Sequence, residues 1–152
     1  MKELKEPSYN NEDLLDHHAV AAVIKDNEDK ILIQEHTKYG FWTLPSGKVK
    51  EGQGIIEGLK QEIFEECNLI IKECKKVFAR EHEYERRNKK VNVNEHIFEV
   101  TNYSGILENK EPLKHTQQKF FSIKEIINLP HVSNLIILYL KTLGIERTVK
   151  LE

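Results

Sequence analysis

The chain contains 152 residues, a length that suits a single domain. Its 23 Lys and Arg nearly cancel its 25 Asp and Glu, and the net charge of −2 excludes a global field that would attract nucleic acid or an acidic membrane. The chain has 39% hydrophobic residues and two cysteines, too few for a disulfide framework. It has no apolar run long enough to cross a bilayer and no segment typical of a signal peptide. We therefore expect a cytoplasmic protein with free thiols.

The first part of the chain predicts an arm followed by a β-hairpin. Residues 1–16 are rich in charge and lack a periodic pattern, so they predict a flexible arm or an edge strand, and residues 17–152 are expected to form one domain. Residues 18–24 are apolar and rich in Val and Ala, which favours a buried strand. A polar turn separates them from a second apolar run over residues 30–34, and the two runs together predict a hairpin.

A short strand, a loop and a helix are predicted next. The strand covers residues 41–44 and stops at Pro45, which cannot donate a backbone hydrogen bond. Residues 46–54 are charged and rich in Gly, so they predict a loop. Residues 55–67 predict a helix that ends at Asn68, a residue type that tolerates the left-handed conformation. One stripe of this helix is apolar and is expected to face a core: Ile55, Ile56, Leu59 and Ile63.

The second half of the chain predicts further strands and two helices. Strands over residues 77–86 and 91–100 flank a polar hairpin tip, and a short strand covers residues 120–121. A capping-box pattern precedes a helix that begins at residue 123, and a last helix covers about residues 132–143. Strands that precede, separate and follow two helical segments predict a mixed α+β or α/β sandwich.

Three acidic residues of the first helix carry the first chemical signal. Glu62, Glu65 and Glu66 are spaced i, i+3 and i+4, so a helix places their carboxylates on one face, mostly separate from the apolar stripe. Clustered carboxylates repel one another unless a cation compensates them, and Mg²⁺ binds carboxylate oxygens while keeping waters for a phosphate substrate. The alternative interpretation is a solvated acidic helix face, because short motifs of this kind often match by chance.

The residues before the helix favour the metal site. A Gly-rich loop leads directly into the helix, and its free N–H groups together with the helix N-terminus can hold phosphate oxygens. The order of residues in the loop and helix resembles the Nudix box, with these positions in register: Gly47, Glu62, Ile63, Glu65, Glu66 and Leu69. The preceding Trp42-Thr43-Leu44-Pro45 is also typical of the Nudix family, and the resemblance covers residues 17–143.

The resemblance implies a Nudix-type α/β/α sandwich with a mixed β-sheet and a metal-dependent pyrophosphohydrolase. The ligands that it implies for Mg²⁺ or Mn²⁺ are Gly47, Glu62, Glu65 and Glu66. The substrate contacts that it implies are Gly47, Lys48 and Trp42. The expected reaction cleaves the diphosphate linkage of a nucleoside triphosphate or a nucleoside diphosphate derivative, and any of the three glutamates could take the proton of the attacking water. The expected binding partner is this small nucleotide, and neither nucleic acid nor a membrane is expected as a partner. The chain is expected to be a monomer or a homodimer.

Several side chains outside the acidic face have two interpretations. Trp42 could stack on a base, but an aromatic residue beside Leu-Pro is more often part of a core. One strand face carries three acids that either extend the metal site or are solvated, the second being favoured: Glu81, Glu83 and Glu85. Three histidines lack the spacing of metal ligands and are expected on the surface or in the core: His82, His96 and His115.

The sequence departs from the family pattern at the box and beyond it. Gln53 stands where the family has Glu, Gln61 where it has Arg, and Asn68 where it has Gly. Many relatives also carry a Glu in the loop before the last strand, where Gln117 is the nearest position. Because a missing acid and a missing base leave no unpaired charge, we expect Gln53 and Gln61 to hydrogen-bond to each other or to the ligands. The departures favour an alternative function, a catalytically weak Nudix-fold nucleotide-metabolite-binding protein, whereas the retained glutamates favour the enzyme.

Overall fold

The computed structural model describes residues 11–146 and contains two β-sheets. The first has the strand order β4 (Ser46–Lys48), β1 (His17–Val23), β6 (Lys89–Ser104) and β5 (Ile70–Arg86). The second has the order β3 (Trp42–Thr43), β2 (Ile31–His36) and β7 (His115–Phe121). Because β1 and β6 run parallel and the other neighbours run antiparallel, the architecture contains the mixed sheet that was expected.

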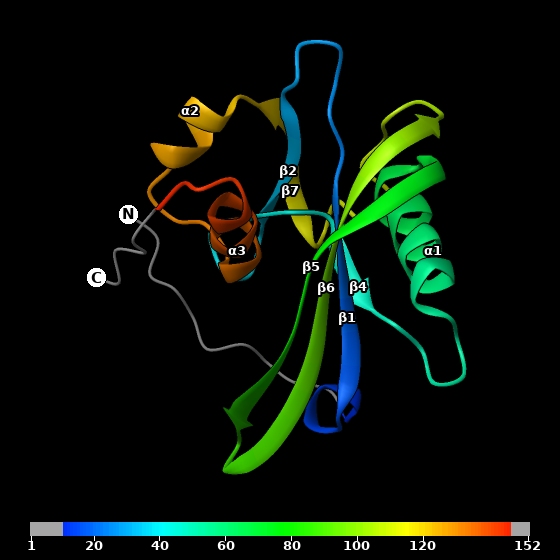
Figure 1. Cartoon of the computed structure of the whole chain (residues 1–152), viewed down its shortest axis with the longest axis vertical. Coiled ribbons are helices and arrows are strands. Elements are labelled where there is room, and N and C mark those ends of the chain that lie inside the picture. Colours follow the sequence, from blue (N-terminus) through cyan, green and yellow to red (C-terminus); the bar gives the residue numbers. More distant parts are fainter. Residues whose placement is uncertain (1–10, 147–152) are drawn as a thin grey trace.

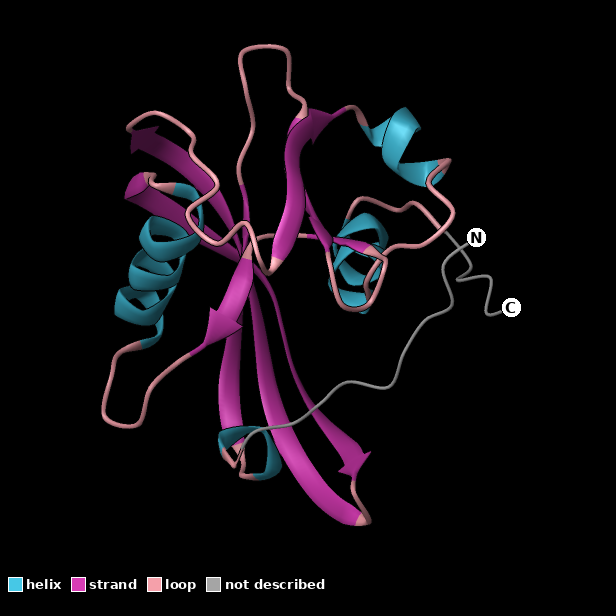
Figure 2. Ribbon diagram, turned by 180° about the vertical axis from the view of Figure 1, so that it is seen from behind, coloured by secondary structure: helices cyan, strands magenta, loops and turns pink. Residues whose placement is uncertain are grey.

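Helices cover both sides of the sheets (Figure 1). α1 (Ile55–Cys67) lies on one side, and α2 (Ile123–Ile127) and α3 (Asn134–Thr142) lie on the other. Figure 2 shows the same layers from behind, with the long β5–β6 hairpin extending past them. This arrangement confirms the predicted α/β/α sandwich. Within residues 11–146, no helix has the length and apolar character needed to cross a membrane.

The predicted N-terminal arm lies partly outside the described residues, which begin at residue 11. Its described part forms a short 3₁₀ helix, η1 (Glu12–Leu14), and not an edge strand. This segment is attached to the β5–β6 hairpin, since Arg86 Nη1 donates to the carbonyl of Asp13 at 2.9 Å. The backbone N–H of Asn92 also donates to Asp16 Oδ1, at 2.8 Å.

The hairpin predicted from residues 18–24 and 30–34 forms only near its turn. There the N–H of Leu32 donates to the carbonyl of Ile24 at 2.8 Å, and Lys25 forms an isolated bridge with Ile31. Beyond the turn the strands separate, β1 entering the first sheet and β2 the second. The reason is that both edges of β1 are occupied, by β4 on one side and by β6 on the other.

Three predicted boundaries are wrong. The loop expected over residues 46–54 begins instead with β4, because Gly47 and its neighbours pair with β1. β5 begins earlier than predicted, at Ile70, and three register shifts along its pairing with β6 interrupt the alternation that would mark it. β7 also begins earlier, at His115, and its polar first half is stabilised by backbone pairing with β2 and not by an apolar pattern.

α1 confirms the helix that was predicted over residues 55–67. It ends at Asn68, whose φ of 62° is the left-handed conformation expected for this residue. Leu59 and Ile63 of the apolar stripe are fully buried, but Ile56 is 47% exposed and does not belong to the stripe. The capping box before α2 is confirmed as well.

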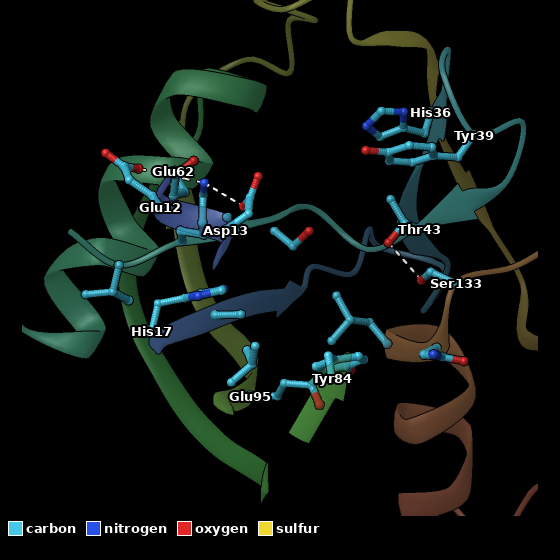
Figure 3. A pocket seen from close by; sticks show the side chains of 18 of the residues that line it. Glu12, Asp13, His17, His36, Tyr39, Thr43, Glu62, Tyr84, Glu95 and Ser133 are labelled. Atoms are coloured by element: carbon cyan, nitrogen blue, oxygen red, sulfur yellow. Dashed lines mark hydrogen bonds and ion pairs between the residues drawn. The ribbon is translucent and has the colours of Figure 1, made fainter. Parts of the chain in front are cut away.

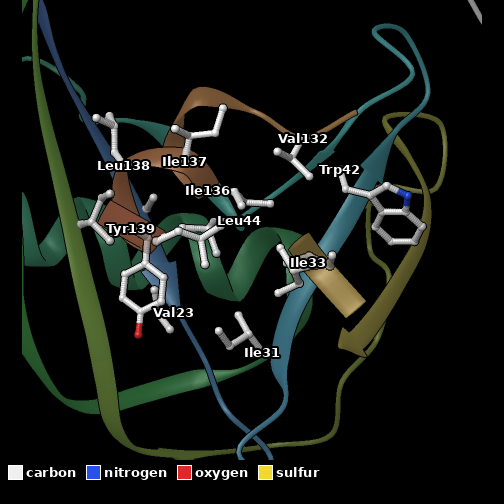
Figure 4. Close-up of a cluster of buried hydrophobic side chains, with 14 residues drawn as sticks. Val23, Ile31, Ile33, Trp42, Leu44, Val132, Ile136, Ile137, Leu138 and Tyr139 are labelled. Carbon is white, nitrogen blue, oxygen red and sulfur yellow. The ribbon is translucent and has the colours of Figure 1, made fainter. Parts of the chain in front are cut away.

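Each side of the sheets has its own hydrophobic core. The core under α1 joins Leu59 and Ile63 to Val20 of β1 and Phe98 of β6. The core on the α3 side is shown in Figure 4. Its labelled members are Val23, Ile31, Ile33, Trp42, Leu44, Val132, Ile136, Ile137, Leu138 and Tyr139. Together the two cores fix the positions of α1 and α3 relative to the sheets.

Candidate active site

A cavity of about 700 Å³ lies where α1, β4 and the β2–β3 turn meet (Figure 3). Four of the predicted site residues line it: Gly47, Lys48, Glu62 and Glu66. Glu65 and Trp42 are not among its lining residues. The structure therefore brings together two of the three predicted carboxylates with the glycine and the lysine of β4.

Gly47 is packed against the carboxyl group of Glu62. A Cβ atom at position 47 would overlap that carboxyl group, so only glycine allows the approach. The antiparallel pairing of β4 with β1, in which Gly47 is opposite Val20, fixes the backbone at this point. The same residue that begins the Nudix box thus provides the space that the first acidic side chain occupies.

Glu66 is the most buried acid of the cluster, with 1% of its side chain exposed. Its Oε2 accepts from Lys114 Nζ at 2.9 Å. Its Oε1 accepts from Gln34 Nε2 and from the backbone N–H of Ser46, both at 3.3 Å. Burial raises the pKa of Glu66, and the charge and hydrogen bond of Lys114 oppose that rise.

Glu62 is half-buried, and its protonation is strongly perturbed. Burial raises the pKa of this carboxyl from 4.5 to about 7, and the charges of Glu66 and Glu65 add to the rise. Glu111 also raises the pKa of both Glu62 and Glu66. A carboxyl group with such a pKa can hold or release a proton in neutral solution, which is the property required of a general acid or base.

The two unusual glutamines are linked as expected. Gln53 Nε2 donates to Gln61 Oε1, and Gln61 Nε2 donates to Glu65 Oε1 at 2.9 Å. Gln53 Oε1 accepts from the backbone N–H of Lys50 at 3.1 Å. A chain of hydrogen bonds therefore runs from the loop before α1 to Glu65 and holds this side chain in an exposed position.

The opposite wall of the cavity is aromatic. The rings of His36 and Tyr39 stack with centroids 4.3 Å apart, and Phe41 lies 5.4 Å from Tyr39. Figure 3 shows His36 and Tyr39 across the cavity from Glu62. Burial, followed by the charge of Lys114, lowers the pKa of His36 to about 4, so this ring is neutral at neutral pH.

Trp42 is a core residue, as its position beside Leu-Pro favoured, and not the substrate contact that the resemblance implied. It is 9% exposed, and its ring meets the Phe121 ring edge to face at 5.1 Å. The position of the neighbouring strand explains this, because Trp42 and Thr43 pair with β2 and alternate in direction. Thr43 points to the cavity side, where its hydroxyl donates to Ser133 Oγ at 2.8 Å (Figure 3).

Lys48 lines the cavity as expected, and its ammonium is 2.7 Å from Asp13 Oδ1. Gln117 does not line the cavity, and its Nε2 donates to Glu35 Oε1 at 3.4 Å. The acid that acts on them from the segment before β7 is Glu111, which sequence reasoning missed. Its position in the loop before β7, where many relatives carry a Glu, is the signal that could have identified it.

Sequence reasoning also missed Lys114 and Gln34, because they belong to elements that are distant in sequence from the box. Three acids of one strand face could have extended the metal site, and all three are exposed: Glu81, Glu83 and Glu85. Of these, Glu85 also lines the cavity. His82 is exposed, whereas His96 and His115 are buried. Each histidine therefore lies on the surface or in the interior, as expected. Both cysteines are free thiols.

The donor set suits a hard divalent cation. Glu62, Glu66 and the carbonyl of Gly47 offer oxygen atoms, which Mg²⁺ prefers to nitrogen and sulfur. Burial is the main cause of the raised pKa values of both carboxyls, and a bound cation would oppose it by favouring their charged forms. Within residues 11–146 no three His, Cys, Asp or Glu side chains are already grouped to hold an ion. Glu65 could join the other two only by leaving Gln61.

Comparison with known proteins agrees with this geometry. Residues 15–138 match the family profile described as NUDIX domain. The chain is 34% identical over 55 residues to the 8-oxo-dGDP phosphatase NUDT18 of Danio rerio, a match that covers 34% of this chain and 17% of that protein. The activity of that longer protein is therefore not transferred to this chain by the match alone.

Solved structures show the same fold at low sequence identity. The MutT NUDIX hydrolase from Burkholderia pseudomallei has a TM-score of 0.71 and 19% identity, covering 83% of this chain and 96% of that one. The MutT protein from Bacillus halodurans has a TM-score of 0.70 and 20% identity, covering 86% and 84%. The NUDIX domain of NrtR from Shewanella oneidensis, solved with ADP ribose, has a TM-score of 0.65 and 10% identity, covering 90% and 92%.

Proposed function

The chain belongs to the Nudix family, and we propose that it is a cytoplasmic, metal-dependent pyrophosphohydrolase that cleaves the diphosphate linkage of a nucleoside triphosphate or a nucleoside diphosphate derivative. The observation that carries this proposal is the placement of Glu62 and Glu66 beside Gly47 at one wall of a cavity of about 700 Å³. A cavity of this volume is of the size that binds small molecules.

Glu62, Glu66 and the carbonyl of Gly47 would hold Mg²⁺ or Mn²⁺, with Glu65 completing the set if it leaves Gln61. Such an ion, when bound, stabilises the negative charge of the diphosphate oxygens and activates water. The water oxygen then forms a bond to phosphorus, and the bond from phosphorus to the bridging oxygen breaks.

The protein contributes the group that takes the proton of the attacking water. Glu65 is exposed and bonded to Gln61, so in this arrangement it lies outside the cavity. Glu62 and Glu66 both line the cavity, and both have raised pKa values. Of the three glutamates, these two are therefore the candidates for the base.

The aromatic wall supports a nucleotide as the substrate. Tyr39 and Phe41 line the cavity opposite the acids, and planar bases stack favourably on aromatic rings. The molecules named in the descriptions of the relatives are 8-oxo-dGDP for the Danio rerio protein and ADP ribose for NrtR. A third relative, an Ap4A hydrolase of C. elegans with a TM-score of 0.60 and 18% identity, is named for Ap4A. Each of these contains both a base and linked phosphates, which matches a site with an aromatic wall and an acidic wall.

The test is a hydrolysis screen of nucleoside triphosphates, dinucleoside polyphosphates and ADP ribose, with and without Mg²⁺, followed by chromatography of the products. We expect metal-dependent cleavage of at least one compound and its loss in Glu66→Gln. Glu57→Gln is the matched control, because Glu57 lies exposed in the first turn of the same helix and does not line the cavity. Absence of cleavage across the panel would refute the enzymatic proposal.

Two observations favour the second candidate, a catalytically weak nucleotide-binding protein. Lys114 already neutralises Glu66, and two amides stand at positions 53 and 61 where the family pattern has charges. For such a protein, calorimetry would detect binding of a nucleotide such as ADP ribose while the same sample left that nucleotide intact over hours. Binding followed by turnover would exclude this candidate.

A further inference from the structure

Lys114 places a positive charge on the most buried of the clustered acids. Its Nζ lies 2.9 Å from Glu66 Oε2, and its side chain is 43% exposed although that of Glu66 is only 1% exposed. The other oxygen of Glu66 accepts from Gln34 and from the N–H of Ser46. Donors of the protein itself therefore satisfy both carboxylate oxygens, and an added cation would have to share Oε2 with the ammonium.

We propose that Lys114 is a tethered counter-ion, which holds Glu66 in the metal-free protein and is displaced when a divalent ion binds. This inference rests on the proposed metal role of Glu62 and Glu66. An ammonium group has no lone pair with which to coordinate a metal, and it repels a second cation at the same oxygen. Metal and Lys114 therefore compete for Glu66, while Gln34 continues to hold the opposite oxygen.

The contacts around Lys114 allow its side chain to leave without movement of the backbone. The carbonyl of Lys114 accepts from both the N–H and the hydroxyl of Thr37, each at 2.9 Å, and its own N–H donates to the carbonyl of Glu111 at 3.0 Å. These bonds anchor the main chain at the start of β7. The side chain has a flexible four-carbon stem and is partly exposed, so its ammonium can move within the cavity that it lines.

The exchange links metal binding to substrate binding. Once displaced, the Lys114 ammonium remains in the cavity near Glu111, where the diphosphate of a substrate would offer it a further anionic partner. The metal binds the Glu66 carboxylate, and the diphosphate binds the Lys114 ammonium. Each residue of the broken ion pair thereby gains a new partner of opposite charge. By reciprocity, the nucleotide should tighten metal binding as much as the metal tightens nucleotide binding.

The primary test is calorimetric titration of Mn²⁺ into the full chain without nucleotide. Lys114→Met removes the competing charge and should tighten Mn²⁺ binding by about 10-fold or more, the scale of coupling between charges in one network. Lys114→Arg keeps a cation and should bind Mn²⁺ no more tightly than the wild type. Lys110→Met is the matched control, because Lys110 belongs to the same loop but its ammonium lies over the Phe64 ring.

A second measurement covers the case in which Lys114→Met is unstable, since this change leaves Glu66 buried without its counter-ion. Mn²⁺ should then raise the melting temperature of Lys114→Met by more than it raises that of the wild type, because the metal replaces the missing ammonium. An equal or smaller rise in the variant would contradict the competition.

The outcomes separate this inference from the function on which it rests. If the wild type binds Mn²⁺ and Lys114→Met binds it equally or more weakly, the counter-ion role is wrong and the metal site stands. If Lys114→Met binds Mn²⁺ and the wild type does not, Lys114 competes for Glu66 but the metal does not displace it, so the displacement part of the inference is wrong. If neither binds Mn²⁺ at any concentration tested, both the metal site and the inference are refuted.

Discussion

The hydrogen bond between Gln53 and Gln61 leads to a quantitative prediction about the positions where the chain departs from the family pattern. Gln53 uses its Nε2 as a donor to Gln61 and its Oε1 as an acceptor for the N–H of Lys50. Gln61 uses its Oε1 toward Gln53 and its Nε2 toward Glu65. Each amide donates through its NH₂ group and accepts through its oxygen, and the hydrogen bonds all run in one direction. A charged side chain introduced at either position therefore disturbs the hydrogen bonds of the other.

Each single substitution should break one bond of this chain. Gln53→Glu removes the Nε2 donor and sets a carboxylate against Gln61 Oε1, so the Gln61 amide must turn and give up its bond to Glu65. Gln61→Arg brings only donors, so the Gln53 amide must turn and give up its bond to Lys50. Both bonds are exposed to solvent, so water can replace the lost partner, and each loss costs about 0.5–1.5 kcal/mol.

The double substitution should restore the whole chain. A Glu at position 53 can accept from the N–H of Lys50 and from an Arg at position 61, which still donates to Glu65. We therefore expect the double variant to be more stable, by about 0.5–3 kcal/mol, than the sum of the two single changes predicts. The assay is urea unfolding of all four proteins, with kcat/KM for a cleaved nucleotide measured on the same samples.

A control cycle combines Gln61→Arg with Asn128→Asp at the end of α2, on the opposite side of the sheets from α1 (Figure 1). This control should be additive within about 0.5 kcal/mol, as distant sites usually are. The same additivity in the cycle of Gln53 and Gln61 would refute the reasoning, because it would show that the two amides do not depend on each other in solution.

Three further predictions concern the acidic cluster. Glu66→Gln should lower kcat by more than about 10²-fold while the protein stays folded, and activity close to that of the wild type would exclude Glu66 from the site. Gly47→Ala should weaken Mn²⁺ binding measured by calorimetry, because the new Cβ displaces the Glu62 carboxyl; unchanged affinity would contradict that contact. The raised pKa of Glu62 means that its protonated form is favoured by folding, so the melting temperature of the metal-free protein should fall as the pH rises from 4.5 towards 7. Glu62→Gln should reduce this fall, and an identical pH profile in both proteins would show that another group controls it.

Local sequence patterns were sufficient to predict α1 and the spacing of its acids. The four-residue recurrence of Leu59 and Ile63 sets the buried side of the helix, and Asn68 ends it in the left-handed conformation, as the structure confirms. These features depend only on residues within one helix. The hydrogen bond between Gln53 and Gln61 was also predictable. The family pattern has an acid at the first position and a base at the second, and the absence of both charges together indicates that the two side chains are in contact.

Features that depend on contacts between elements were not predictable from the pattern. Lys114 and Gln34 reach Glu66 from strands or loops that are distant in sequence, and nothing in their local sequence distinguishes them. β4 was missed because its strand character comes from pairing with β1 and not from its Gly-containing sequence.

The helical arrangement of α1 explains why Glu66 requires a cation as its partner. Successive residues of a helix are rotated by about 100°, so Glu66 lies only about 20° from Leu59 around the axis, whereas Glu62 lies about 60° away and Glu65 about 120°. The rotation that buries Leu59 therefore also buries Glu66, leaves Glu62 at the rim of the cavity and turns Glu65 to solvent, in agreement with their exposure. The acidic face and the apolar stripe thus overlap, contrary to the expectation that they lie mostly apart. A carboxylate that is buried by the packing of its own helix needs compensating positive charge, which Lys114 supplies in the metal-free protein and which a divalent ion would supply during catalysis.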